Sequence, residues 1–109
     1  MANTNKILGQ ASLTSGATIT VYSAPAATEA IVSTAYICNR DSSDTTFRLL
    51  AAVSAAASAN EQYLYYDVAL PANDTFAATV GMTLGALDEV RASSPDGAVS
   101  VTLFGVEVS

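Results

Sequence analysis

The sequence predicts an all-β fold in which about eight strands form a two-layer antiparallel sandwich. Apolar residues recur mostly at every second position, the period of a strand with one buried face. Gly, Pro, Asn, Asp and Ser interrupt these runs at short intervals, as turns do between short strands. Charged residues make up only 13% of the chain, while Thr and Val, which favour pleated backbone, are abundant.

The first two expected strands cover residues 6–12 and 17–23, with Ser15 and Gly16 in the turn between them. The second of these strands alternates apolar residues with Thr and Tyr, which predicts one buried face. Residues 1–5 are mostly polar, and we expect a short flexible arm there.

Pro25 interrupts pairing because it lacks an amide donor, and residues 29–39 then form the third expected strand. Adjacent apolar residues such as Ile31 and Val32 place apolar side chains on both faces of this strand. This pattern predicts a central strand that is covered on both sides, one side by a neighbouring subunit.

Residues 45–53 continue the strand pattern through Phe47 and lead into residues 51–60, which are rich in Ala and Ser. Ala is the best helix former, so a short helix over residues 49–59 is one interpretation of this stretch. The embedded Ser residues and the strand-like residues before them favour an irregular excursion. The sequence leaves both interpretations open.

Residues 61–70 form the next expected strand, and strict alternation places Tyr63, Tyr65 and Asp67 together on one face. Residues 75–84 have the most regular alternation in the chain, with an apolar face opposite a face rich in Thr. We therefore expect the second of these strands to have one core face and one threonine-coated face.

The last two expected strands are residues 88–93 and 98–108, joined at Asp96 and Gly97, a dipeptide that favours a hairpin. Short connections between all the strands indicate antiparallel pairing rather than βαβ units. The sequence thus predicts a single sandwich domain over residues 1–109, of the jelly-roll or immunoglobulin-like type.

Charge and the distribution of apolar residues argue against two classes of partner. The net charge is −6, and the 4 Lys and Arg residues are too few to form a basic surface that would bind nucleic acid. The chain has no apolar run long enough to cross a membrane and no hydrophobic leader. We therefore expect a protein that is made and stays soluble in a cytoplasm.

The residue types also argue against an enzyme. The chain contains no His, the commonest general base and a frequent metal ligand. The close carboxylate pairs, Asp41 with Asp44 and Asp88 with Glu89, fall at turns or strand starts, where acidic side chains ordinarily cap the backbone. Cys38 is the only cysteine and fits a small buried hydrophobe better than the alternative, a reactive or intermolecular thiol. We expect no catalytic residue, no metal and no cofactor.

Three tyrosines close together in residues 61–70 belong either to the sandwich core or to an interface. Tyrosine rings supply large contact area at low entropic cost and are enriched at interfaces. Tyr63 and Tyr65 are the better interface candidates because alternation places them on the same face as Asp67. Ala55 and Ala57, in the ambiguous stretch, are further candidates for subunit contacts.

Several phrases of the sequence are idiosyncratic. They are Cys38-Asn39-Arg40, Thr46-Phe47-Arg48, Tyr63-Leu64-Tyr65-Tyr66-Asp67, Pro71-Ala72-Asn73-Asp74-Thr75-Phe76 and Phe104-Gly105-Val106-Glu107. Taken together they resemble a family of small virion proteins of tailed bacteriophages, and the resemblance runs from about Lys6 to the end of the chain. It implies no catalytic residues. The chain departs from the family at 52–59, where relatives usually carry Pro or Gly.

The resemblance implies a virion structural protein, and the leading hypothesis is a head decoration or cement protein that stabilises the capsid shell. Its expected partners are copies of itself, as a trimer, and the major capsid protein or another virion protein. The first alternative is a tail, baseplate or fibre component, either an adaptor or a receptor-facing module. A carbohydrate-binding sandwich or an enzyme outside any virion is the remaining class.

Overall fold

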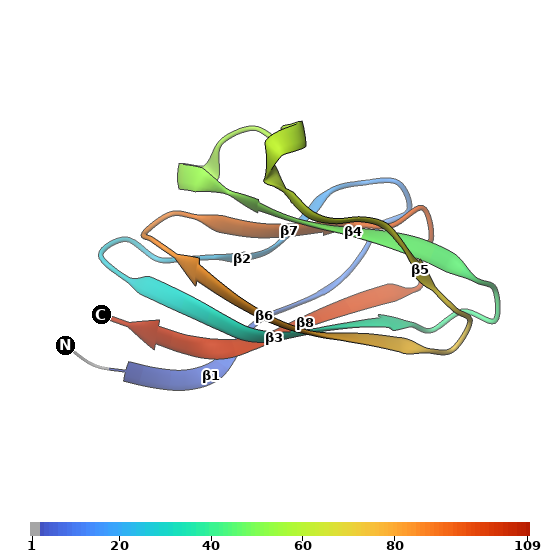
Figure 1. The fold of residues 1–109 in the computed structure, drawn as a ribbon, viewed down its shortest axis with the longest axis horizontal. Helices are drawn as coiled ribbons and strands as arrows, with labels where there is room; N and C mark the ends of the chain where they lie inside the picture. Colours follow the sequence, from blue (N-terminus) through green and yellow to red (C-terminus); the bar gives the residue numbers. More distant parts are fainter. Residues whose placement is uncertain (1–2) are drawn as a thin grey trace.

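In a computed structural model that describes residues 3–109, two antiparallel sheets of four strands each pack face to face (Figure 1). Sheet A has the strand order β1-β8-β3-β6, and sheet B has the order β2-β7-β4-β5. The strands are β1 Asn3–Ser12, β2 Ile19–Ser23, β3 Glu29–Asn39, β4 Thr45–Ala52, β5 Tyr63–Leu70, β6 Thr75–Leu84, β7 Glu89–Ser93 and β8 Val99–Val108. The prediction of an eight-stranded all-β sandwich is confirmed.

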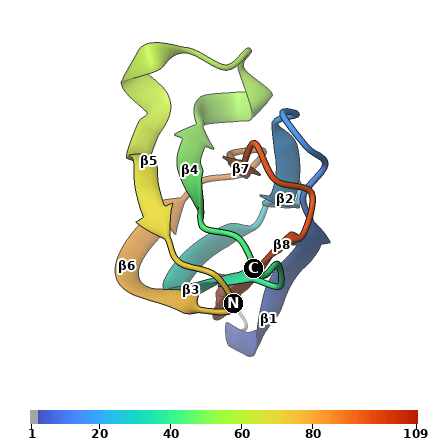
Figure 2. The same cartoon turned by 90° about the vertical axis from the view of Figure 1, so that its right-hand side faces the viewer.

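The strand pairing corresponds to one long antiparallel hairpin that has been rolled up. β4 pairs with β5, β3 with β6, β2 with β7 and β1 with β8, so each successive pair lies further from the middle of the chain. Rolling puts alternate pairs into opposite sheets, where β8 also pairs with β3 and β7 with β4. This order is that of a jelly roll, one of the two types that the sequence predicts. Figure 2 shows the two layers from the end.

The hydrophobic core lies between the two sheets and is built by alternate residues of each strand. Val32 and Ile37 of β3 and Leu103 of β8 are fully buried on the sheet A side, opposite Phe47 and Leu49 of β4. Burying each such side chain stabilises the fold by about 1.5–3 kcal/mol. In β6 the alternation runs as the sequence predicts, because its threonines face outward and Phe76, Ala78, Val80, Met82 and Leu84 face the core.

All four edge strands carry extra residues that interrupt the pairing register. Each extra residue opposes no partner of its own, so the strand bends and its twist increases locally. The positions are Leu8 in β1, Val21 in β2, the Val80-Gly81 pair in β6, and both Leu64 and the Tyr66-Asp67 pair in β5. Asp67 and Gly81 have φ values of 52° and 58°, a left-handed conformation that occurs at such bulges.

Residues 53–62 leave sheet B as an irregular excursion with two short 3₁₀ turns, Val53–Ala55 and Asn60–Gln62. We call residues 53–62 the excursion. In Figure 1 it rises above the outer surface of sheet B, away from sheet A. Of the two interpretations that the sequence left open for this stretch, the irregular one is confirmed.

The start of the chain differs in part from the flexible arm expected over residues 1–5. β1 begins at Asn3, and Asn3, Thr4 and Asn5 pair with β8 in an antiparallel ladder. Residues 1–2 lie outside the described residues. Backbone pairing to β8 therefore overrides the polar composition of residues 3–5.

Candidate interaction surface

The outer face of sheet A is uncovered and carries large apolar side chains. The exposed fractions are 48% for Ile7, 41% for Ile31, 42% for Tyr36 and 38% for Phe104. The rings of Tyr36 and Phe104 meet edge to face, with their centroids 5.6 Å apart. We call this surface the open face. Mostly Thr, Ser and small residues surround the apolar ones: Gln10, Ser12, Ser33, Thr34, Cys38, Thr75, Ala77, Thr79, Ser100 and Thr102.

Charge is almost absent from the open face. Within the described residues, the strands of sheet A contain three charged residues, Lys6, Glu29 and Glu107. The register places all three at one end of the sheet, because Glu29 pairs with Val108 and Lys6 with Gly105. The centres of protein interfaces are depleted of charge and enriched in aromatic residues, and the open face has both properties.

A hollow of about 540 Å³ opens on this face over β1, β8 and β3. Ile7, Ile31, Phe104 and Val106 form its apolar walls, and the rest of its lining is Asn5, Lys6, Ser33 and Gly105. Register shifts occur beside Phe104 on both flanks, in β1 and in β3, so the regular pleat is interrupted there. The hollow therefore follows from the backbone, and it has room for an aromatic side chain.

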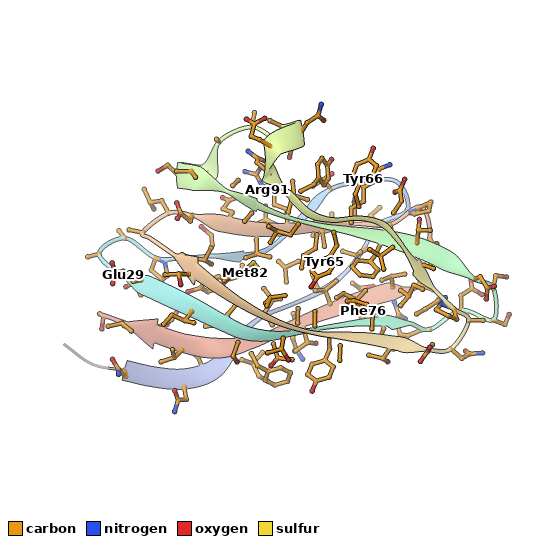
Figure 3. All side chains as sticks on the ribbon, viewed as in Figure 1. Glu29, Tyr65, Tyr66, Phe76, Met82 and Arg91 are labelled. Atoms are coloured by element: carbon orange, nitrogen blue, oxygen red, sulfur yellow. The ribbon has the colours of Figure 1, made fainter. Side chains whose placement is uncertain are left out.

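The outer face of sheet B, by contrast, is covered by the excursion. Leu50 and Ala52 point outward, because they pair with Arg91 and Glu89 while the residues between them point to the core. Both are nevertheless buried. Arg91 holds the cover in place: its Nη1 donates to Ser58 Oγ at 3.1 Å and its Nε to Glu89 Oε1 at 3.0 Å. In Figure 3, Arg91 lies beneath the excursion.

Beside the excursion, Arg48 of β4 organises an ion pair and two tyrosines. Its Nε and Nη2 donate to the two carboxylate oxygens of Asp67 at 2.6 and 3.2 Å. Its guanidinium carbon lies 4.0 Å from the ring centroid of Tyr66, a cation–π contact. Tyr63 meets Tyr66 edge to face with centroids 5.0 Å apart. The hydrogen bonds from Arg48 hold the pKa of the Asp67 carboxyl below its usual value.

The structure corrects the expected grouping of the tyrosines. Tyr63, Tyr65 and Asp67 do not share one face, because the extra residues in β5 break the alternation. Tyr65 lies between the sheets, with ring centroids 6.1 Å from Phe47 and 5.6 Å from Phe76 (Figure 3). Tyr63 lies instead with Asp67 on the outer side of sheet B. A bulge cannot be read from apolar spacing, so alternation alone could not place these side chains.

The remaining candidates, Ala55 and Ala57, are exposed on the excursion. Sequence reasoning did not identify Tyr36 and Phe104, although the apolar residues on both faces of residues 29–39 were a signal for an uncovered face there. Cys38, expected to be buried, is only partly buried on the same face.

Three of the four carboxylates that could have suggested acid–base chemistry accept hydrogen bonds from the backbone, and the fourth, Glu89, accepts from Arg91 Nε. Asp41 Oδ1 accepts from the Ser42 amide at 2.7 Å, and Asp44 Oδ1 accepts from the Ala72 amide at 2.9 Å. Asp88 accepts from the amides of Ser54 and Gly85. Over residues 3–109, no cluster of three His, Cys, Asp or Glu residues is placed to hold a metal ion. No helix in that same part of the chain is long and apolar enough to cross a membrane.

A second hollow, of about 360 Å³, lies beside Arg48. Several of its polar groups already bond to one another: Arg48 pairs with Asp67, and Ser94 Oγ donates to Thr46 O at 2.7 Å. Ser94 Oγ also accepts from the Asp96 amide at 3.1 Å. These groups are satisfied within the chain and are not aimed at a ligand.

A hydrogen bond joins the two sheets at the charged end of sheet A. Tyr22 of β2 donates its hydroxyl proton to Glu107 Oε2 at 2.6 Å, and Lys6 Nζ lies 3.3 Å from Glu107 Oε1. Burial and the carboxylate raise the pKa of Tyr22. The Tyr22 hydrogen bond, followed by Lys6, lowers the pKa of Glu107. The cluster thus neutralises a carboxylate that the sandwich partly encloses.

The fold and its surfaces define a jelly-roll sandwich with one covered and one open outer face. Comparison of the chain with protein-family models, with curated proteins and with solved structures finds no match. The resemblance to bacteriophage virion proteins therefore rests on the phrases of the sequence itself.

Proposed function

We propose that this chain is a non-enzymatic structural protein of a tailed-bacteriophage virion, a head decoration protein that stabilises the capsid shell. The observation that carries the proposal is the open face. Its exposed aliphatic and aromatic side chains, with charge confined to one end, suit a surface that is covered in an assembly. Packing against such a face removes apolar area from water without burying an unpaired charge.

Contacts of this kind can stabilise a shell because they are repeated in many copies. A shell offers the same site repeatedly, so a protein that binds the assembled shell and not its free subunits stabilises the assembly by mass action. The phrases that resemble phage virion proteins support this setting. The jelly-roll fold is compatible with a virion role but does not by itself indicate one, because the same fold also occurs in lectins.

The test is the copy number of the chain in purified virions, measured by quantitative mass spectrometry against the major capsid protein. A decoration protein is present in hundreds of copies, in a fixed ratio to the capsid subunit. A few copies or tens of copies would instead favour the tail, baseplate or fibre alternative and would refute the decoration role.

A second measurement addresses stabilisation directly. Heads that lack the protein are heated with and without added protein, and release of their DNA is followed by dye fluorescence. We expect wild-type protein to raise the release temperature and Phe104→Glu, on the open face, to lose most of this effect. Leu64→Glu is the matched control, because Leu64 is also an exposed apolar residue but lies on sheet B. Equal protection by all three proteins would contradict the role of the open face.

A further inference from the structure

We infer that the open face binds the open face of a second copy of this chain, in a two-fold symmetric dimer in which Tyr36 of each copy fills the hollow of the other. The inference rests on the proposed role of the open face as an assembly contact and names its occupant. Under this inference the dimer, and not the single chain, is the unit that joins the shell, so the open face contributes to the assembly by forming the dimer.

The open face carries a projection and a matching depression side by side. Tyr36 projects from β3, and its ring stands edge to face against Phe104. Phe104 also forms one wall of the hollow, on the side towards Tyr36. Along β8, Tyr36 lies at the level of Thr102, whereas the hollow extends from Phe104 to Val106. Projection and depression are therefore displaced along the strands, with Phe104 between them.

This arrangement is self-complementary under one symmetry operation. A two-fold axis that lies in the plane of the face and crosses the strands at Phe104 reverses positions along the strand direction. It therefore places Tyr36 of one copy over the hollow of its partner, and the reciprocal contact forms at the same time. Isologous interfaces have this property, in which residue i meets j and j meets i. Two sheets that pack in this way lie about 10 Å apart, as they do in a sandwich core.

The size of the face is sufficient for a dimer. The four strands of sheet A, each about ten residues long, give a projected area of about 600 Å², from spacings of about 3.3 Å per residue and about 4.8 Å between strands. The smallest stable specific interfaces bury about 600 Å² per partner. The projected area of the open face thus reaches the smallest area that stable interfaces bury per partner. The protruding side chains add further area to it.

The open-face arrangement also keeps the charge repulsion between two copies small. Each chain has a net charge of −6, so two copies repel one another unless their charges stay apart. In the open-face dimer the axis at Phe104 keeps the charged end of each sheet A away from the other charged end. The charged side chains on the outer surface of sheet B, Arg48, Asp67, Glu89 and Arg91, remain outside the contact.

The experiment measures the self-association of the full chain by sedimentation equilibrium over a range of concentrations. We expect wild-type protein to form a dimer and Tyr36→Glu to raise the dimer dissociation constant by about 30-fold or more, the effect of losing a central aromatic contact. Ile31→Lys, in the hollow, should weaken the dimer similarly. Leu64→Glu should dimerise as the wild type does. Circular dichroism checks that each variant keeps the β-sheet spectrum.

Mixing the two weakened variants tests the specific contact. In a heterodimer of Tyr36→Glu and Ile31→Lys chains, one contact joins Glu to Lys and the other is the native pair of Tyr36 with Ile31. Each homodimer, in contrast, contains two impaired contacts. We expect the mixture to dimerise at least about tenfold more tightly than either variant alone, which loss of folding could not produce.

Other outcomes overturn the inference. A wild-type chain that stays monomeric at high concentration, a trimer, or a mixture that associates no better than its components would each refute the open-face dimer. A monomer that is nevertheless present in hundreds of copies per head would leave the decoration role standing without this dimer. A dimer found only in tails would leave the dimer standing without the decoration role.

Discussion

The two outer faces of the sandwich differ in what covers them. On sheet B the chain supplies its own cover, because the excursion buries Leu50 and Ala52 and its contact with Arg91 holds it in place. On sheet A the corresponding surface leaves Tyr36 and Phe104 exposed and has no charged side chain at its centre. The comparison shows that the chain covers the apolar side chains on one outer face itself and leaves those on the other exposed, and this difference is the basis for proposing a partner at sheet A.

The largest expected effect distinguishes the covered face from the open one. Leu50→Ala should lower the free energy of unfolding by about 3 kcal/mol, because it leaves a cavity beneath the excursion. Ile31→Ala, on the open face, should cost less than about 1 kcal/mol, since its side chain is already partly in water. Urea denaturation followed by circular dichroism measures both, at concentrations too low for self-association. Similar costs at the two positions would remove the distinction.

The next largest effect on stability is expected from the hydrogen bond between Tyr22 and Glu107, which joins the two sheets at one end. Tyr22→Phe removes the hydroxyl that donates to Glu107, and we expect a loss of about 1–2 kcal/mol at neutral pH, as for a hydrogen bond to a charged group. The same denaturation assay measures it. Tyr36→Phe, which removes a hydroxyl from the open face, is the matched control and should leave stability unchanged.

The hydrogen bond between Tyr22 and Glu107 also predicts that the free energy of unfolding depends on pH. The pKa of Glu107 is lower in the folded chain than in the unfolded chain, so the unfolded chain binds more protons as pH falls below about 5. The stabilisation is present above that range and is lost as pH falls through the folded pKa. Tyr22→Phe removes the main cause of the shift and should flatten the decline in stability between about pH 5 and pH 3. A decline as steep as that of the wild type would show that other carboxylates dominate.

A smaller effect tests how the cover is held. Arg91→Met keeps much of the side-chain length but removes the hydrogen bonds to Ser58 and Glu89, and we expect a loss of about 1 kcal/mol. The excursion should also open more often, which a nonspecific protease reports as faster cleavage within residues 53–62. If cleavage is unchanged, Arg91 does not retain the cover.

The smallest effect is expected on the open face itself. Tyr36→Ser should change the stability of the dilute monomer by less than about 0.5 kcal/mol, because Tyr36 lies outside the core and is 42% exposed. Thermal unfolding at low protein concentration measures this. A large loss would mean that the exposed aromatic pair stabilises the monomer, which would weaken the argument that it serves a partner.

Much of the fold could be predicted from the sequence because its signals are local. Alternation and turn residues located all eight strands, and the regular pattern from Thr75 to Leu84 predicted which side of β6 faces the core. The side-chain directions in β5 could not be predicted, because the bulges at Leu64 and Asp67 depend on pairing with β4. The open face could be predicted only in outline. Apolar residues on both faces of residues 29–39 predicted a strand that is covered on both sides. The hollow could not be predicted, because it depends on the register between β1, β8 and β3.

The extra residues in the edge strands have a consequence for crowding. An exposed edge with a regular ladder can recruit a strand from a neighbouring molecule and start a fibril. Here Leu8, Val21, Gly81 and Leu64 interrupt the ladder at every outer strand, so no edge offers a long straight run of free amides and carbonyls. Copies of the chain at high local density are thereby kept from merging their sheets and remain separate folded units.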